Sequence, residues 1–400
     1  MKFKFFLIIF TFTSTACLAK VPLVLLSIDG FAQRYLDQYQ PTTLNKLKQQ
    51  GTSAKALLPI FPSKTFPNHL SIITGQYPVN HGIVHNDFFH RGINKSYQLG
   101  DGKNDSRWLT AEPLWHINEM QGNKSAVYFW PESETAINNQ NASYYYPYKH
   151  FTPNKARLDQ ILDWLRLPES KRPNFIAGYF ASVDDAGHDF GENSPQLVKA
   201  IMDLDTLLEN FIETINTEFS GQVNLVIVSD HGMTKIGPKN IIKWQNMQID
   251  NVKVINGSTQ LYLYSDDKLA INKSIERFKH QQENGDKTGY SIYKSPNFPK
   301  HWQLNNTTAA TPNAIIDASS SYIFDKGHSH IDPETHGYDP KYLRDLDAIF
   351  IATGPAFKKG LEVAPFENVN VLPIITRALG LTDVDNIDGS YEIADQIVKQ

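Results

Sequence analysis

The feature that most constrains this chain is an apolar, β-forming run that ends abruptly in an acid and an imidazole. Residues 223–228 (VNLVIV) are followed at once by Ser229, Asp230 and His231. Residues 21–28 (VPLVLLSI) repeat this arrangement and end at Asp29. Continuous apolar runs of this kind are typical of strands that are buried on both faces, as in parallel sheets. We therefore expect a parallel sheet that carries polar side chains at the ends of its strands.

Helical patterns separate these runs along most of the chain. Leu204, Leu208 and Phe211 belong to a one-sided apolar stripe, the ordinary pattern of a helix that covers a sheet. This alternation indicates an α/β fold with a mostly parallel central sheet flanked by helices. Residues 20–400 are expected to form a single domain, in which the polar region of about 251–323 is an insertion or cap. The further expected strands are 125–130, 175–180 and 348–352, with a strand pair within 252–264, and the expected helices are 42–50, 155–165 and 197–215.

Residues 1–19 have the composition of a signal peptide. Lys2 and Lys4 precede a short apolar core that is too brief to span a membrane. The single cysteine, Cys17, lies in this segment, but the residues before it lack the leucine that is usual at a lipoprotein site. Cleavage after Ala19 is therefore favoured over lipid anchoring, and it would leave no disulfide. We expect a secreted or periplasmic protein without a transmembrane segment.

The charge of the chain limits its partners. The formal net charge of -4 leaves no basic footprint, so binding to a nucleic-acid duplex is not expected. A small anionic substrate would instead be held locally, by metal ions or a few cationic groups. The sequence does not set an oligomeric state.

The stretch of residues 61–86 carries a candidate nucleophile. An apolar helical run follows Thr65 and stops at Gly75, as it would at a helix C-cap. Thr65 therefore lies at a helix N-terminus, where unpaired N–H groups and the helix dipole favour a bound anion. A hydroxyl at this position can also be a helix cap and nothing more. The residues at the predicted strand ends decide between these interpretations.

Those residues are acids and histidines that are distant in sequence. Ligands of open α/β sheets bind outside the carboxyl ends of the strands. Each residue alone has an ordinary explanation as a turn, a cap or a structural imidazole. Together they supply the carboxylate and imidazole ligands of zinc-type sites with open positions. The set comprises Asp29, Asp184, His188, Asp230, His231 and His336.

Ordered motifs give the chain a specific resemblance. The sequences KTFPNHLSIITGQYP with NHGI, DxxGH, SDHGM, HGYD and IFIATGPAFKKG follow one another along the chain. In this order they resemble the nucleotide pyrophosphatase/phosphodiesterase family of the alkaline phosphatase superfamily, over about residues 21–357. The resemblance implies an alkaline phosphatase-like fold and a catalytic domain with two Zn²⁺, or another divalent ion. By position, one zinc site comprises Asp184, His188 and His336, and the other comprises Asp29, Asp230, His231 and the hydroxyl of Thr65.

The resemblance also implies a reaction and its substrate. Thr65 would be the nucleophile, and Asn86 would help to hold the phosphate. Phe66 would offer an aromatic face to a nucleotide base, with Tyr145 as the opposite face. The implied reaction is hydrolysis of nucleotide phosphodiester or pyrophosphate bonds through a covalent intermediate on Thr65, with release of nucleoside monophosphates.

The remaining histidines of these motifs are expected to have other roles. We assign His69 and His81 to structural hydrogen bonds. His328 and His330 lie close to His336, but only His336 has the HGYD context of a ligand.

Two other classes of protein compete with this interpretation. The first is a related phosphomonoesterase or phosphonate hydrolase that uses the same metals. The second is a non-catalytic binding protein that keeps zinc for stability. The presence of Thr65 and Asn86 argues against the second, because a structural metal needs neither a nucleophile nor an open coordination position.

Overall fold

The computed structural model describes residues 20–284, 289–327 and 331–399, so the expected signal peptide at 1–19 lies outside the described residues. Its centre is an eight-stranded sheet with the order β19-β2-β18-β9-β1-β8-β6-β7. The strands from β9 to β7 are all parallel, whereas β18 runs antiparallel between β9 and β2. The expected mostly parallel sheet is confirmed. The strands are β1 (Leu23–Ile28), β2 (Thr52–Ala54), β6 (Ser125–Tyr128), β7 (Tyr144–Tyr146), β8 (Phe175–Phe180), β9 (Asn224–Val228), β18 (Phe350–Thr353) and β19 (Leu361–Val363).

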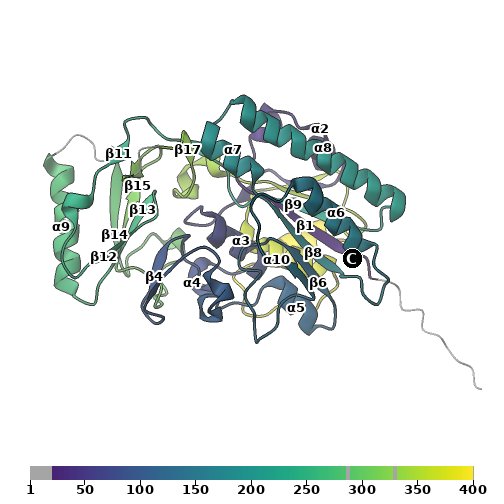
Figure 1. Ribbon diagram of the computed structural model, residues 1–400, viewed down its shortest axis with the longest axis horizontal. Coiled ribbons are helices and arrows are strands. Elements are labelled where there is room, and N and C mark those ends of the chain that lie inside the picture. The colour runs from purple at the N-terminus through teal and green to yellow at the C-terminus, as the bar shows by residue number, and fades with distance from the viewer. Residues whose placement is uncertain (1–19, 285–288, 328–330, 400) are drawn as a thin grey trace, which may run out of the picture.

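Helices cover both faces of this sheet (Figure 1). The helices expected at 42–50, 155–165 and 197–215 form one layer, and helices from the N-terminal third and the C-terminal end form the other. The first layer contains α1 (Tyr35–Gln38), α2 (Thr42–Gln50), α6 (Asn154–Leu165), α7 (Ser182–Phe190) and α8 (Pro195–Glu218). The second contains α3 (Thr65–Thr74), α4 (Pro78–His81), α5 (Leu114–Met120), α10 (Val371–Ala378) and α11 (Glu392–Ile397).

Strand β1 lies between the two helical layers, so it carries apolar side chains on both of its faces. Leu23 and Leu25 join the apolar cluster of α3 and α10, whereas Val24 and Leu26 join that of α2, α6 and α8. Successive side chains of a strand point to opposite faces, so a strand between two helical layers buries them all. Strand β6, on the far side of β8, ends at Tyr128, two residues before the expected end. There Phe129 adopts a φ of +70°, and the chain turns out of the sheet.

The region expected as an insertion or cap contains a second sheet. Its four strands are antiparallel in the order β12-β13-β15-β14, and the expected strand pair within 252–264 is confirmed by β12 and β13. An apolar cluster of its own joins this sheet to α9, and in Figure 1 both lie beside the main sheet. The elements are β12 (Lys253–Asn256), β13 (Gln260–Tyr264), α9 (Lys268–Asn284), β14 (Tyr290–Lys294) and β15 (Ala314–Ala318).

Short elements connect these parts. The pairs are β3 (Leu57–Leu58) with β20 (Phe366–Glu367), β4 (Phe88–His90) with β5 (Lys95–Tyr97), β10 (Thr234–Lys235) with β17 (Glu334–Thr335), and β11 (Ile241–Ile242) with β16 (Ile323–Phe324). Short 3-10 helices lie at 101–103, 106–108, 245–247, 300–302, 340–342, 344–346 and 368–370. Among the described residues, no helix combines the length and the apolar character that crossing a bilayer requires.

The strand order brings the candidate ligands to one edge. Strands β9, β1 and β8 are neighbours and parallel, so their carboxyl ends lie side by side. Asp29 follows β1, Asp230 follows β9, and α7 with Asp184 follows β8. The pairing of β17 with β10 then draws His336 to the same edge.

Candidate metal centre

The six acids and histidines form two groups of three at this edge. One group is Asp184, His188 and His336, and the other is Asp29, Asp230 and His231. Within each group one potential ligand atom from each residue lies within 4.8 Å of the others. These are the sets of three that the sequence assigned to two separate ions.

The first group combines a helix with a loop. Asp184 and His188 lie four residues apart on α7, and Asp184 Oδ2 is 3.6 Å from His188 Nε2. Asp184 Oδ1 is 3.8 Å from His336 Nε2. The expected shared face of a helical turn is therefore present.

The second group is more deeply buried. His231 Nε2 lies 3.0 Å from Asp230 Oδ2 and 3.5 Å from Asp29 Oδ1. The rings of His231 and His336 stack with their centroids 3.7 Å apart, so the two groups share a wall. Two ions bound to these groups would therefore occupy adjoining positions in one site.

Each of the three imidazoles is oriented by a backbone carbonyl. The Nδ1 atoms of His188, His231 and His336 lie 3.1, 2.9 and 2.8 Å from the carbonyl oxygens of Glu334, Gly232 and Ser63. A carbonyl oxygen can only accept, so each Nδ1 carries the proton and donates it. Each Nε2 is then left with a lone pair that faces the acids, which is the arrangement of histidines that bind metals.

The carboxylates leave oxygens that only a cation would satisfy. Asp29 Oδ1, Asp184 Oδ1 and Asp230 Oδ2 are buried and accept no hydrogen bond. Burial and the neighbouring acids raise the pKa of Asp29 well above its usual value. Burial, together with His231, lowers the pKa of His336. Buried polar atoms are normally paired, so this donor set of carboxylates and neutral imidazoles fits divalent cations, and zinc in particular.

Glycine at position 30 makes room for these groups. Gly30 has a φ of +69°, and a β-carbon there would overlap Asp184 Oδ1 and its backbone. Its N–H also donates to Asp230 Oδ1 at 3.2 Å. The left-handed conformation and the close approach both require a residue without a side chain.

Thr65 lies beside the second group, as the first residue of α3. Its Oγ1 is 3.4 Å from His231 Nε2. Helix α3 ends at Gly75, which has a φ of +66° and caps the helix as expected. The N–H of Phe66 donates to Asn86 Oδ1 at 3.0 Å, so this oxygen is occupied by the helix N-terminus. Asn86 also lines the cleft in front of Thr65, to which it can offer its amide N–H groups.

A cleft of about 490 Å³ opens in front of the two groups. Phe66 lines it, as the sequence indicated, but Tyr145 does not. Tyr145 lies in β7, 39% exposed, between Tyr144 and Tyr146, whose rings pack near Trp164. The tyrosine that lines the cleft is Tyr148, three residues further on. The sequence does not show which tyrosine reaches the cleft, because three tyrosines are adjacent and nothing marks where β7 ends.

Sequence reasoning also missed two residues that support the ligands. The Tyr179 hydroxyl donates to Asp29 Oδ2 at 2.5 Å. Lys64 Nζ donates to the carbonyl oxygen of His336 at 2.9 Å, and burial lowers the pKa of Lys64 to about 7. Tyr179 lies in an expected strand and Lys64 lies in a motif of the sequence. Only the contacts in the structure show that they support Asp29 and His336.

The expected structural roles of His69 and His81 are confirmed. His69 Nδ1 lies 2.9 Å from the carbonyl oxygen of Thr65, and His81 Nε2 lies 3.2 Å from that of Pro67. His328 and His330 lie outside the described residues.

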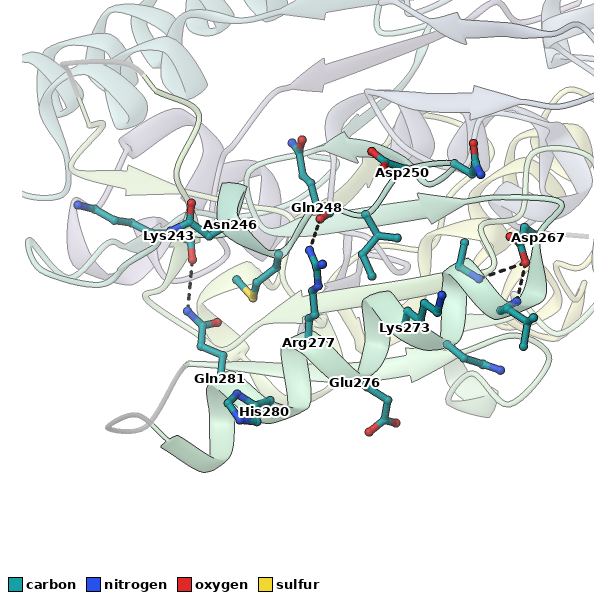
Figure 2. Close-up of a pocket in the computed structure, with 16 residues that line it drawn as sticks. Lys243, Asn246, Gln248, Asp250, Asp267, Lys273, Glu276, Arg277, His280 and Gln281 are labelled. Carbon is teal, nitrogen blue, oxygen red and sulfur yellow. Dashed lines mark hydrogen bonds between the residues drawn. The ribbon is translucent and has the colours of Figure 1, made fainter.

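A larger hollow, of about 1430 Å³, lies in the cap between α9 and residues 243–251 (Figure 2). Arg277 extends from α9 across it and donates to the carbonyl oxygen of Gln248. Among the described residues, the acid and histidine groups that could hold a cation include none of its lining. The candidate chemistry is therefore at the sheet edge and not in this groove.

The chain is similar to known proteins over most of its length. The family model for type I phosphodiesterase / nucleotide pyrophosphatase matches residues 23–339. A venom phosphodiesterase of Naja atra is 32% identical over 393 residues, which cover 94% of this chain and 46% of that protein. The chain thus spans about half the length of the curated relatives it matches.

Solved structures share the fold. Murine ectonucleotide pyrophosphatase/phosphodiesterase 5 superposes with a TM-score of 0.85 and 25% identity, over 94% of this chain and all of that one. An inactive threonine-to-alanine variant of the same murine protein, in complex with AMP, superposes with a TM-score of 0.84, again at 25% identity, over 94% of this chain and 99% of that one.

Because several buried acids lie close together, we expect the thermal stability of the protein to depend on bound metal. Zn²⁺ added to metal-free protein should raise the melting temperature, and EDTA should reverse the rise, because bound cations neutralise the buried carboxylates. Each site should contribute about 2.7 kcal/mol when free metal is 100 times its dissociation constant. Differential scanning fluorimetry measures the shift.

Two variants make this measurement specific. His188→Ala should reduce the zinc-dependent shift, whereas His280→Ala, which removes an exposed imidazole of the cap, should leave it unchanged. Equal shifts in wild type and His188→Ala would contradict the assignment.

Proposed function

The chain belongs to the type I phosphodiesterase / nucleotide pyrophosphatase family, and from this premise we propose that it is a two-zinc hydrolase of nucleotides. It cleaves phosphodiester or pyrophosphate bonds and releases nucleoside monophosphates. The observation that carries the proposal is the position of the Thr65 hydroxyl, 3.4 Å from His231 Nε2 and at the mouth of the cleft. An alcohol beside two open ligand sets is the arrangement of a nucleophile and not of a structural metal site.

The residues divide the chemistry among themselves. Asp184, His188 and His336 hold one cation, and Asp29, Asp230 and His231 hold the other. When bound, zinc lowers the pKa of a coordinated hydroxyl and neutralises charge on phosphoryl oxygens. Thr65 Oγ1 would form a bond to phosphorus and release its proton to solvent water, while the bond from phosphorus to the leaving oxygen breaks and that oxygen keeps the electron pair. The nucleoside monophosphate remains esterified to Thr65 until water displaces it and restores the hydroxyl.

The N-terminus of α3 stabilises the transferred group. The N–H of Thr65 has no partner within the helix, and the positive end of the helix dipole faces the phosphoryl oxygens. Asn86 is held by the N–H of Phe66 through Oδ1, so its Nδ2 donates to a phosphoryl oxygen. Donors fixed in advance in this way act like an oxyanion hole.

The aromatic walls of the cleft hold the nucleoside. Phe66 and Tyr148 both line the cleft, and base stacking on aromatic rings tolerates different bases. Tyr148 takes the role for which the sequence suggested Tyr145. The murine structure that contains AMP supports a nucleotide as the ligand.

The proposal extends to the location and boundaries of the protein. Export by a signal peptide at residues 1–19 would place the protein in the periplasm or outside the cell. Residues 20–400 would act as one catalytic domain, with about 251–323 as its cap. The venom phosphodiesterase that the chain resembles carries a name consistent with a secreted enzyme.

A pair of substrates tests this function against its alternatives. The protein should hydrolyse p-nitrophenyl thymidine 5′-monophosphate faster than p-nitrophenyl phosphate, since only the diester fills the aromatic cleft. EDTA should abolish both reactions and zinc should restore them. A preference for the monoester would instead identify a phosphomonoesterase, and inertness in excess zinc would identify a binding protein.

Substitution of the nucleophile tests the covalent step. Thr65→Ala should lower kcat on p-nitrophenyl thymidine 5′-monophosphate roughly 10⁴-fold or more, because removal of a nucleophile leaves only residual catalysis. Thr65→Ser keeps a hydroxyl and should retain part of the activity. Zinc content, measured by inductively coupled plasma mass spectrometry, should be unchanged in both. A Thr65→Ala protein with its metals and full turnover would rule out the mechanism.

A further inference from the structure

Residues 131–134 line the cleft together with Phe66 and Tyr148, and they include an unusual acid. Glu132 is only 4% exposed, and it has a φ of +60°. A residue with a side chain enters this left-handed region at an energetic cost, and such residues persist only where their surroundings impose the conformation. Neither the metal groups nor the proposed chemistry uses Glu132.

The carboxylate of Glu132 is fully engaged by neighbouring residues. Oε1 accepts a short hydrogen bond from the hydroxyl of Tyr97, and Oε2 accepts one from Thr135 Oγ1 at 2.7 Å. The backbone of Gly102 lies directly against the same carboxylate, where a β-carbon would overlap Oε2 and Thr135 Oγ1. Glu132 therefore joins its own loop to the segment 97–103.

That segment packs against Phe66 of α3. The Tyr97 ring meets the edge of the Phe66 ring, with centroids 6.4 Å apart, and it also stacks on Phe88. Further along the same segment, Leu99, Gly100 and Lys103 line the cleft directly. A shift of Tyr97 would thus move the aromatic face and the lining beside it together.

The same loop holds the opposite wall through a second acid. Glu134 Oε1 accepts a hydrogen bond from the backbone N–H of Tyr148 at 3.1 Å. The Tyr148 hydroxyl contacts His150 Nδ1 at 2.9 Å, which fixes the other end of that side chain. Two acids, separated by one residue, therefore connect one short loop to both aromatic faces.

We propose that Glu132 is a positioning residue that sets the separation of the two aromatic walls, and thereby the affinity of the site for the nucleoside half of its substrate. The inference rests on the proposed nucleotide function. Glu132 belongs to neither ligand group, and it acts through Tyr97 and Phe66. Its loss should weaken binding of a nucleoside without slowing the transfer of the phosphoryl group.

A glycine substitution tests this role without a backbone penalty. Glu132→Gly removes the carboxylate, while glycine adopts a φ of +60° without strain. The KM for p-nitrophenyl thymidine 5′-monophosphate should rise about tenfold, the usual effect of losing a hydrogen bond to a charged group, with kcat changed less than twofold. The KM for methyl p-nitrophenyl phosphate, a diester without a nucleoside, should stay the same. Tyr97→Phe removes the same bond from its other end and should reproduce the effect.

A matched control and a conservative variant complete the test. Glu367 accepts a hydrogen bond of 2.6 Å from the Tyr77 hydroxyl, away from the cleft lining, so Glu367→Ala removes a similar bond and should leave both KM values unchanged. Glu132→Gln keeps an acceptor for Tyr97 and should recover part of the nucleotide affinity.

The outcomes separate this inference from the function on which it rests. Equal changes in KM for both diesters, or no change in either, would overturn the role of Glu132 alone. A wild-type protein that does not favour the nucleotide diester over the methyl ester would overturn the proposed nucleotide function, and the inference with it.

Discussion

The structure depends on how it accommodates three acidic side chains that lie close together at the ends of neighbouring strands. Asp29 and Asp230 are fully buried, Asp184 lies next to them, and each has an oxygen that accepts no hydrogen bond. An unpaired buried carboxylate costs several kcal/mol, so a fold that keeps three of them together needs positive charge at that point. Burial lowers the pKa of His336, so this imidazole does not supply that charge.

The strands and helices around the acids bring the other residues of the site to the same edge of the sheet. The parallel order β9-β1-β8 brings three strand ends together, and the short pair β10–β17 adds His336. Gly30 allows the backbone of one strand end to approach Asp184. Helix α3 then directs its N-terminus, with Thr65, at the same point. The proposed nucleophile, the N-terminus of α3 and the two groups of acids and histidines thus converge at one edge of the sheet.

Much of this could be predicted from the sequence, for physical reasons that are visible in particular residues. The run from 21 to 28 is apolar apart from Ser27 because both faces of β1 are buried, so its strand character and its end at Asp29 could be predicted. The spacing of Asp184 and His188 placed them on one helical face. The ordered motifs identified Thr65 and Asn86, since their roles depend on local sequence at a helix end.

What the sequence could not give depends on contacts between distant segments. The end of β7 decides that Tyr148, and not Tyr145, reaches the cleft, and three adjacent tyrosines hold no periodicity that could show it. In the sequence Tyr179 is an ordinary aromatic residue of a buried strand, and only the structure shows that its hydroxyl donates to Asp29. Glu132 gains meaning only from its conformation and from its contact with Tyr97, thirty-five positions away in the chain.

The most direct test of the account is anomalous diffraction at the zinc edge from crystals of the zinc-loaded protein. Two peaks should appear, one among Asp184, His188 and His336 and one among Asp29, Asp230 and His231, with metal–ligand distances of about 2.0–2.2 Å. The second peak should also lie against Thr65 Oγ1. A single peak, or peaks that are remote from these side chains, would contradict the claim that the strand ends converge to hold two cations beside one threonine.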